Sequence, residues 1–322
     1  MSGFAMRRQL GKTGLQVSPL GLGGGNGISS EDVLYAFDQG INYFFFSSDL
    51  HHMAYQRSAE AIRKLCGRGS SVRDEVVLAT VSYLNDPDKL LTVLLDQFSE
   101  LKIDYIDVFH WGWVTDKVDA LALYQAAAAF KSGETASQEQ SLFRASVMMA
   151  HAQEINKELV QRGLVRHVGM SFHSRKMARV MMQDIDVLMI RYNIARPDVE
   201  EHVFAHLTGK KDSDPGIVAF NVAREGILSF HRPPRGYPAQ LPVPTIPECY
   251  RFALTNPSVD LVLAGITTRQ ELLQALAALE QGPLSPDENE FIREYGSLYR
   301  GDMLKTFYPF VSTPLARSLS KN

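Results

Sequence analysis

The chain has 322 residues, 45% of them hydrophobic, and its 33 basic and 36 acidic residues give a formal net charge of −3 at pH 7. This balance argues against a nucleic-acid-binding surface, and no apolar run reaches the length of a membrane span. The first residues carry Arg7, Arg8 and Lys12 but no apolar segment of signal-peptide length, so we expect a cytoplasmic protein.

Eight short apolar segments recur along the chain, and most are followed by a stretch with helical spacing. They are Val17 to Gly25, Asn42 to Ser47, Glu75 to Val81, Tyr105 to Trp111, His167 to Ser171, Val187 to Tyr192, Gly216 to Asn221 and Asp260 to Ile266. Apolar strands that alternate with helices are typical of a parallel sheet covered by helices. Eight units predict a single-domain α/β protein, a (β/α)8 TIM barrel, which typically takes about 250 residues. A doubly wound sheet, the competing architecture, would need fewer strands.

Two parts of the chain exceed a minimal barrel, which we place at residues 1–300. An insertion at about 114–147 enlarges the loop after the fourth strand, and a C-terminal tail covers 301–322. Loops after strands build the active site in this barrel class, so the insertion is expected to shape a pocket or to contact another subunit. The tail is a second candidate surface for a partner. In the last predicted helix, Ser285 is the cap, Pro286 takes the first helical position and Glu288 completes a capping box, and the helix is expected to end near Arg300.

The two cysteines, Cys66 and Cys249, lack the CxxC spacing of a metal or redox site. We therefore expect buried thiols. Adjacent histidines His51 and His52 do not by themselves make a zinc site, so no metal is predicted.

A series of motifs then follows in order from residue 7 to about 280. They are Arg8 to Gly23, Gly40 to Phe44, Tyr105 to Val108, Gly163 to Ser171, Arg191 to Asn193, Arg224 to Leu228 and Ala264 to Thr267. Together they resemble the aldo-keto reductase family. The resemblance implies a (β/α)8 barrel that transfers a hydride from NADPH or NADH to a carbonyl, with an Asp, Tyr, Lys and His tetrad at the barrel mouth.

The four tetrad positions of that family carry other residues in this chain. In register, they are occupied by Phe45 for Asp, Leu50 for Tyr, Val81 for Lys and Gly112 for His. A carbonyl that accepts hydride becomes an alkoxide and needs a proton donor beside it. The resemblance therefore implies a degenerate tetrad and a non-standard proton donor.

The resemblance also implies a set of cofactor-binding residues. They are Ser171, Phe220, Gly226, Leu228, Gly265, Thr267 and Arg269. Phe220 offers an aromatic face for a ring, and Thr267 and Arg269 begin a helix that could hold a phosphate. Met189 stands where the family has Gln, so the nicotinamide site is only partly kept, and the choice between NADPH and NADH stays open.

Replacement catalytic groups are sought near the missing tetrad. The loop after the second strand offers Asp49, His51 and Tyr55, and histidine is a general acid near neutral pH. His110 lies two residues before Gly112 and shares its strand face, so it would point into the barrel from a deeper layer. The alternative interpretations are a polar surface loop and a hydrogen-bonded core histidine.

Four further residues are candidates for binding the substrate. Trp111 and Trp113 could form an aromatic wall for a flat ligand. His173 and Asn193 follow the fifth and sixth strands, whose ends converge on the mouth of a barrel.

The leading functional hypothesis is a divergent aldo-keto reductase, an NAD(P)H-linked oxidoreductase that reduces a small carbonyl or an imine. A protonated imine already carries positive charge and needs no alkoxide stabilisation. Two alternatives remain: a non-redox barrel enzyme that uses His and Asp in dehydration, cyclisation or isomerisation, and a catalytically inactive homologue that binds a ligand or a partner. A retained cofactor site would favour the first, a polar pocket the second and a plugged apolar mouth the third.

Overall fold

A closed barrel of parallel strands forms the centre of the protein, and the predicted TIM-barrel fold is confirmed. The computed structural model describes residues 3–47, 52–83, 87–114, 153–223, 228, 233 and 237–303. The barrel strands in spatial order are β10 (Leu261–Ala264), β3 (Leu20–Gly23), β4 (Tyr43–Ser47), β5 (Val77–Ser82), β6 (Ile106–Val114), β7 (Val165–Phe172), β8 (Val187–Arg191) and β9 (Gly216–Phe220).

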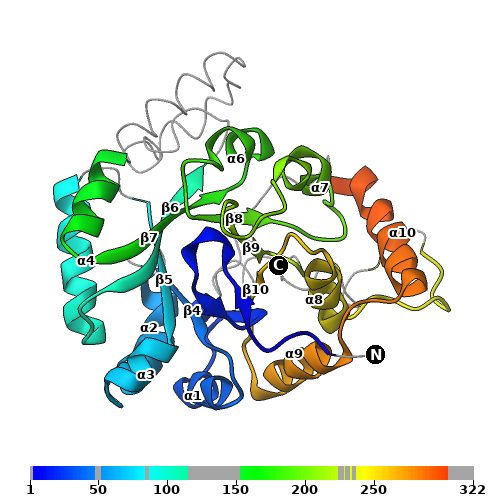
Figure 1. The fold of residues 1–322 in the computed structure, drawn as a ribbon. Coiled ribbons are helices and arrows are strands. Elements are labelled where there is room, and N and C mark those ends of the chain that lie inside the picture. The colour runs from blue at the N-terminus through cyan, green and yellow to red at the C-terminus, as the bar shows by residue number, and fades with distance from the viewer. Residues whose placement is uncertain are drawn as a thin grey trace, which may run out of the picture.

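Helices surround this barrel (Figure 1). They are α1 (Ser30–Asp38), α2 (Gln56–Cys66), α3 (Ser70–Glu75), α4 (Pro87–Leu101), a helical segment at 153–161, α6 (Arg175–Met181), α7 (Val199–His202), α8 (Ile246–Thr255), α9 (Arg269–Gln281) and α10 (Pro286–Met303). Within the described ranges, none of these helices combines the length and the apolar character that crossing a bilayer requires.

The capping box predicted for the last helix is present. The Ser285 amide donates to the Glu288 carboxylate over 2.7 Å, and the Glu288 amide donates back to the Ser285 hydroxyl over 3.3 Å. The helix begins at Pro286, as expected, and extends to Met303.

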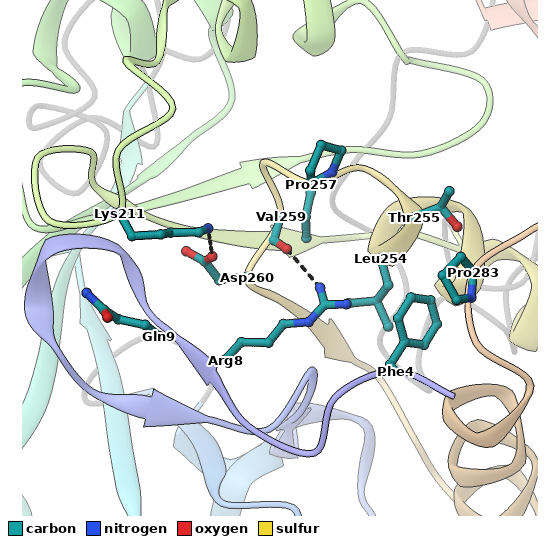
Figure 2. A pocket seen from close by; sticks show the side chains of 10 residues that line it. All are labelled: Phe4, Arg8, Gln9, Lys211, Leu254, Thr255, Pro257, Val259, Asp260 and Pro283. Atoms are coloured by element: carbon teal, nitrogen blue, oxygen red, sulfur yellow. Dashed lines mark hydrogen bonds and ion pairs between the residues drawn. The ribbon is translucent and has the colours of Figure 1, made fainter. Parts of the chain in front are cut away.

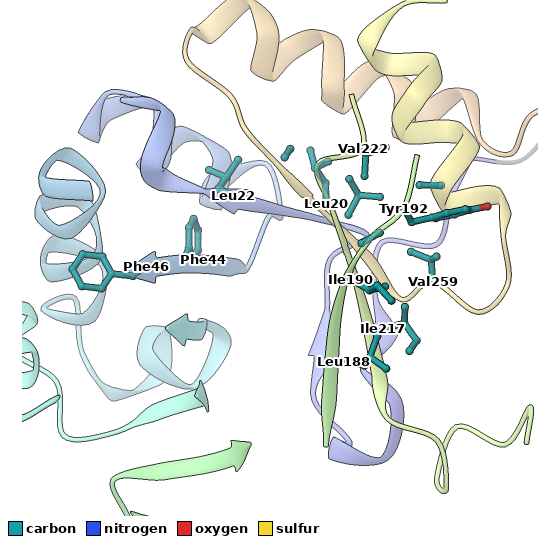
Figure 3. Close-up of a cluster of buried hydrophobic side chains, with 14 of the residues drawn as sticks. Leu20, Leu22, Phe44, Phe46, Leu188, Ile190, Tyr192, Ile217, Val222 and Val259 are labelled. Carbon is teal, nitrogen blue, oxygen red and sulfur yellow. The ribbon is translucent and has the colours of Figure 1, made fainter. Parts of the chain in front are cut away.

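Alternation along the strands separates two apolar clusters. On β4, Tyr43 and Phe45 join the cluster inside the barrel, whereas Phe44 and Phe46 join the larger cluster under the helices. Successive side chains of a strand point to opposite faces, which explains how a run of aromatic residues fills both layers. Figure 3 shows part of the outer cluster, with Leu188 and Ile190 on β8.

A short antiparallel hairpin closes the amino-terminal end of the barrel. Its strands are β1 (Arg8–Gln9) and β2 (Gln16–Val17), drawn in dark blue in Figure 1. Leu10 and Val17 are fully buried and belong to the inner cluster, so the hairpin seals this end with apolar side chains. The sequence had predicted one strand from Val17 to Gly25, but the barrel strand begins only at Leu20, after Pro19, which has no N–H to donate to a ladder.

Carboxylates tie adjacent strands together at the same end. Asp107, Asp186 and Asp260 lie at the starts of β6, β8 and β10, and each accepts a backbone N–H from the preceding strand, at 2.9, 3.0 and 2.9 Å respectively. Each is also paired with a cation. Asp107, which is 1% exposed, binds Arg73 at 2.9 Å and Arg166 at 3.0 Å.

A cavity of about 440 Å³ opens beside the hairpin (Figure 2). Asp260 is paired with Lys211 there, and the Arg8 guanidinium donates to the Val259 carbonyl over 3.0 Å while lying over the Phe4 ring. Burial lowers the pKa of Arg8 and raises that of Asp260. This cavity lies at the closed end of the barrel, opposite the carboxyl ends of the strands, where enzymes of this barrel class place their chemistry.

Candidate active site at the barrel mouth

The candidate site lies at the carboxyl ends of the strands, which we call the mouth. Four partly buried side chains pack there on the inner cluster: Tyr55, Tyr83, Phe220 and Leu263. Beneath them lie buried apolar residues of the same cluster, including Phe45, Val81 and Met189. The mouth is therefore an apolar floor surrounded by two phenols and an aromatic ring.

Tyr83 occupies the space above Gly112, the position of the missing family histidine. A Cβ built on Gly112 would lie 2.1 Å from Cδ1 of Tyr83, so any larger residue at position 112 would displace this ring. Tyr83 follows Val81 by two residues and shares its strand face. Tyr83 was not among the predicted site residues, although alternation from Val81 was the signal that could have identified it.

Tyr55 ends the short helical turn η3 (His52–Tyr55) and reaches over the loop that follows β3. Its ring lies 6.4 Å from that of Phe45 and 5.7 Å from that of Phe46, and a Cβ on Gly25 would lie 2.9 Å from the phenol oxygen. Burial raises the pKa of Tyr55 to about 12. The phenol therefore keeps its proton at neutral pH and is a weaker acid than a free phenol, so only a strongly basic partner such as an alkoxide would take that proton.

His110 lies below the mouth, inside the barrel. Its side chain is completely buried, and Nε2 shares a hydrogen bond of 3.4 Å with the hydroxyl of Tyr43, whose pKa burial raises. Among the described residues, Nδ1 has no hydrogen-bond partner, and a Cβ on Gly169 would lie 2.6 Å from it. Burial lowers the pKa of His110 to about 3, so the imidazole is neutral. This is the deeper-layer position that strand alternation predicted.

His173, Arg191 and Phe220 form one group at the ends of β7, β8 and β9. The His173 ring meets the Phe220 ring edge-on at 5.6 Å, and the Arg191 guanidinium carbon lies 5.9 Å from the same ring. Burial, then the charges of Arg191 and Arg175, lower the pKa of His173 to about 3. His173 is thus a neutral group in a positive environment. The sequence analysis did not select Arg191, although it follows Met189 by two residues on the inner face.

Asn193 is buried and organises the loop after β8. Its Nδ2 donates to the Asn221 carbonyl over 3.1 Å, and its Oδ1 accepts the amides of Ala195 and Arg196. The amide of Asn193 is thus engaged with the backbone. Its contact with substrate remains a prediction. The hydrogen bonds show that Asn193 positions the loop after β8.

Trp111 does not line the mouth, contrary to the prediction. It belongs to the outer cluster, its ring packs edge-on against Phe109 at 5.3 Å, and Nε1 donates to Asn156 over 3.0 Å. The reason is strand alternation, since Trp111 lies next to the inward-facing His110 and therefore faces the helices. The side chain of Trp113 lies outside the described residues.

The predicted phosphate-binding residues are engaged with carboxylates. Thr268 and Glu271 form a capping box at the start of α9, and the Glu271 carboxylate also accepts the Thr267 amide over 2.7 Å. Arg269 is ion-paired with Asp32 and lies over the Tyr35 ring at 3.9 Å. A phosphate at this helix terminus would have to replace the Glu271 carboxylate.

The remaining predicted cofactor residues are partly described. Ser171 is a buried residue near the end of β7, in register with Met189, and Leu228 is fully buried. A Cβ on Gly265 would lie 2.2 Å from Nδ2 of Asn26, so this glycine allows two loops at the mouth to approach. Asp49, His51, Leu50 and Gly226, together with most of the insertion and the tail, lie outside the described residues.

For the ring end of a nicotinamide cofactor, Phe220 at the end of β9 would supply an aromatic face and Ser171 on β7 a hydroxyl, with β8 between these two strands. At the phosphate end, the amides of Thr267 and Thr268 just before α9 donate to the Glu271 carboxylate. A phosphate could accept from the same amides only in place of this carboxylate.

Comparison with known proteins places the chain in a family. The sequence profile of the Aldo/keto reductase family matches residues 28–296. A search of curated proteins found no match. Among solved structures, the apo form of aldo-keto reductase AKR11C1 from Bacillus halodurans is 21% identical, with 90% of this chain and 95% of that chain covered and a TM-score of 0.61.

The holo form of the same Bacillus halodurans enzyme is 20% identical over the same shares, with a TM-score of 0.63. A Pseudomonas aeruginosa protein assigned to the aldo-keto reductases is 18% identical, with 87% of this chain and 96% of that chain covered and a TM-score of 0.57. At these identities the structures establish a shared fold, and the profile match over most of the sequence establishes the relationship. The chain therefore belongs to the aldo/keto reductase family.

Proposed function

We propose that the protein is an NAD(P)H-linked reductase of small carbonyl or imine compounds whose proton donor lies outside the tetrad positions. The observation that carries this proposal is the rim of the mouth, where two phenols and the Phe220 ring surround an apolar floor. The family membership supports hydride transfer as the reaction class, and the phenols supply the proton donor that Phe45, Val81 and Gly112 cannot.

Phe220 and Ser171 are the residues that would hold the nicotinamide ring. When bound, the reduced cofactor supplies the hydride. The apolar residues of the floor, Phe45, Val81 and Met189, would exclude water from the reacting carbon and strengthen nearby electrostatic interactions.

Proton transfer completes the proposed reaction. The carbonyl carbon takes up the hydride, the electron pair of the C=O π bond moves to oxygen, and that oxygen takes the phenolic proton of Tyr55 or Tyr83. Solvent then returns a proton to the phenolate. A protonated imine needs no such donor, because its nitrogen receives the electron pair and becomes a neutral amine.

His110 and His173 do not act as acids in this scheme. Both imidazoles are neutral at physiological pH because burial lowers their pKa values to about 3. His110 positions the inner wall through its hydrogen bond to Tyr43, and His173 supports Phe220 through its edge-on contact. Asp49 and His51 remain proposed contributors from the loop that precedes Tyr55.

The test begins with calorimetric titration of the purified protein with NADPH and with NADH. We expect saturable binding, tightened in a Glu271→Gln variant because the neutral side chain competes less well with a phosphate for the Thr267 and Thr268 amides. Failure of both cofactors to bind at millimolar concentration would overturn the proposal and favour non-redox catalysis or partner binding.

The second step identifies the donor. With a reducible carbonyl, Tyr55→Phe or Tyr83→Phe is expected to lower the turnover rate by about 10²- to 10⁴-fold, the usual contribution of general acid catalysis, with little change in cofactor affinity. Tyr105→Phe is the matched control, because Tyr105 lies at the closed end of the barrel beside Arg73. Full turnover in both mouth variants would exclude the phenols.

A further inference from the structure

The cavity beside the hairpin brings one arginine together with apolar side chains. Its volume of about 440 Å³ falls within the range of about 300–1,000 Å³ that is usual for small-molecule sites. In Figure 2, Phe4 and Leu254 lie on one side of the Arg8 guanidinium. The ion pair of Lys211 with Asp260 lies on the other side. The cavity therefore has the size and the mixed lining of a site for a small amphipathic molecule.

Within the described ranges, the Arg8 guanidinium has donors without a partner. Its Nη1 donates to the Val259 carbonyl over 3.0 Å, and its carbon lies 5.1 Å from the centroid of the Phe4 ring. A guanidinium presents several N–H donors in a fixed fork, and this carbonyl is the one acceptor that Arg8 meets among the described residues. The fully buried polar atoms without a partner include none from Arg8, so its unused donors are accessible from the cavity.

Asp260 acts on Arg8 through its charge, but its oxygens have other partners. One oxygen is paired with Lys211, and the other accepts the Ile217 amide over 2.9 Å. The charge of Asp260 raises the pKa of Arg8 less than burial lowers it. By contrast, Arg73 at the same end of the barrel binds its carboxylate partner directly, at 2.9 Å. In the part of the chain that the structure describes, Arg8 is therefore a half-buried cation without a directly bound anion.

The charges around the cavity suit a ligand with a single negative charge. The charged residues of the lining are Arg8, Lys211 and Asp260, which sum to one positive charge. Asp212 accepts from Nε2 of Gln9 nearby but is outside the lining, and Asp260 is the carboxylate whose charge acts on Arg8. A planar guanidinium fork matches a carboxylate, whereas a phosphate monoester carries a charge of about −1.5 to −2 at pH 7.

We propose that this cavity is a ligand site separate from the mouth, and that its ligand is a small monocarboxylate with an aromatic or branched apolar group. The carboxylate accepts hydrogen bonds from the unused donors of Arg8, and the apolar group packs against Leu254, Pro257 and Pro283. Such a ligand links the hairpin to the connection between α8 and β10 and so stabilises the closed end. The site does not depend on the proposed reduction, and a failure of cofactor binding would leave it intact.

Calorimetric titration of the full chain tests the class of ligand. The probes are phenylacetate and isocaproate, their neutral amides, and phenyl phosphate. We expect saturable binding of at least one carboxylate, with weaker binding of its amide and of phenyl phosphate, because the lining offers one net positive charge. The proposal would be overturned if neither carboxylate bound at millimolar concentration, if an acid and its amide bound equally, or if phenyl phosphate bound more tightly than both acids.

Variants of Arg8 test where the carboxylate binds. Arg8→Gln removes the charge and should weaken the binding by about 10- to 150-fold, the range of a charged hydrogen bond. Arg8→Lys keeps the charge but loses the planar fork, so its affinity should be intermediate. Arg179→Gln, which removes an exposed arginine from α6, is the matched control and should bind as the wild type does. Wild-type affinity in Arg8→Gln would contradict the proposal.

Pro257→Trp tests the cavity without altering a charge. Pro257 is exposed and lines the cavity, so an indole ring at this position would occupy its space. We expect this variant to lose carboxylate binding while its circular dichroism spectrum stays that of the wild type, which provides the test if Arg8→Gln does not fold. Saturating phenylacetate or isocaproate, whichever binds, should raise the Tm of the wild type but not that of Pro257→Trp. Undiminished binding in Pro257→Trp would exclude this cavity as the site.

Discussion

Polar side chains have different surroundings at the two ends of the barrel. At the closed end, Asp107, Asp186 and Asp260 each accept a backbone N–H and face a cation, so their charges are satisfied inside the fold. At the mouth, the histidines are neutral and the phenols border an apolar floor. Satisfied charges fix strands in register at the closed end, whereas the groups at the mouth are the ones that the proposed chemistry would use. The cavity beside the hairpin therefore belongs to the stabilising end, and the proposed chemistry is expected at the other.

The largest effect is expected at the closed end. Asp107→Ala leaves Arg73 buried without its carboxylate and removes the acceptor of the Leu78 amide. Breaking a buried pair in this way costs about 3–5 kcal/mol in the free energy of unfolding. Urea unfolding followed by circular dichroism measures it. Glu60→Ala, which removes an exposed pair with Lys64, is the control and should change stability by less than about 0.5 kcal/mol. Equal effects of the two variants would erase the contrast between buried and exposed carboxylates.

A smaller loss is expected from Gly112→Ala at the mouth. The new methyl group would meet the Tyr83 ring, and overpacking of this kind costs about 1–3 kcal/mol. The same substitution in a Tyr83→Ala background should cost less, because the clashing ring is gone. A double-mutant cycle of unfolding free energies gives the coupling. Additive effects would mean that the ring moves aside freely, which would weaken its assignment as a fixed donor.

The effect that is smallest near neutral pH concerns acid sensitivity, which we assign to the mouth side. The unfolded chain protonates histidine near its ordinary pKa of 6.5, whereas burial lowers the folded-state pKa values of His110 and His173 to about 3. The unfolded state therefore binds more protons in this window, and stability falls as the pH is lowered through it.

Each histidine contributes a slope of at most about 1.4 kcal/mol per pH unit. A His173→Asn variant should lose stability less steeply on acidification than wild type, as measured by urea unfolding at a series of pH values. Identical slopes in the two proteins would show that His173 does not titrate differently in the folded state.

The fold was readable from the sequence, and the reason lies in the barrel strands. Segments such as Val187 to Ile190 are apolar on both faces and recur between helices, a pattern that few architectures produce. The boundary error at Val17 arose because an apolar hairpin precedes the first barrel strand, and two apolar pieces on either side of Pro19 looked continuous. The capping box at Ser285 was recognised because it is local in sequence.

The site was less predictable, because its geometry depends on neighbours distant in sequence. Alternation alone could have placed Trp111 outside and Arg191 inside, but the meeting of Tyr83 with Gly112 depends on the pairing of β5 with β6. Glu271 was overlooked as a competitor for the Thr267 amide, although Thr268 and Glu271 have the spacing of a capping box. Roles assigned to Asp49, His51, Gly226 and Trp113 remain predictions.

The seam where β3 meets β10 has a consequence for how the chain reaches its native state. Val262 pairs with Leu20, and the Val262 amide donates to the Pro19 carbonyl over 2.9 Å, so the last strand completes the wall beside the first. Forming contacts between residues so distant in sequence costs loop-closure entropy. The chain loses this entropy before the contacts stabilise the fold. During synthesis, one edge of the first barrel strand must therefore stay unpaired until nearly the whole chain has left the ribosome.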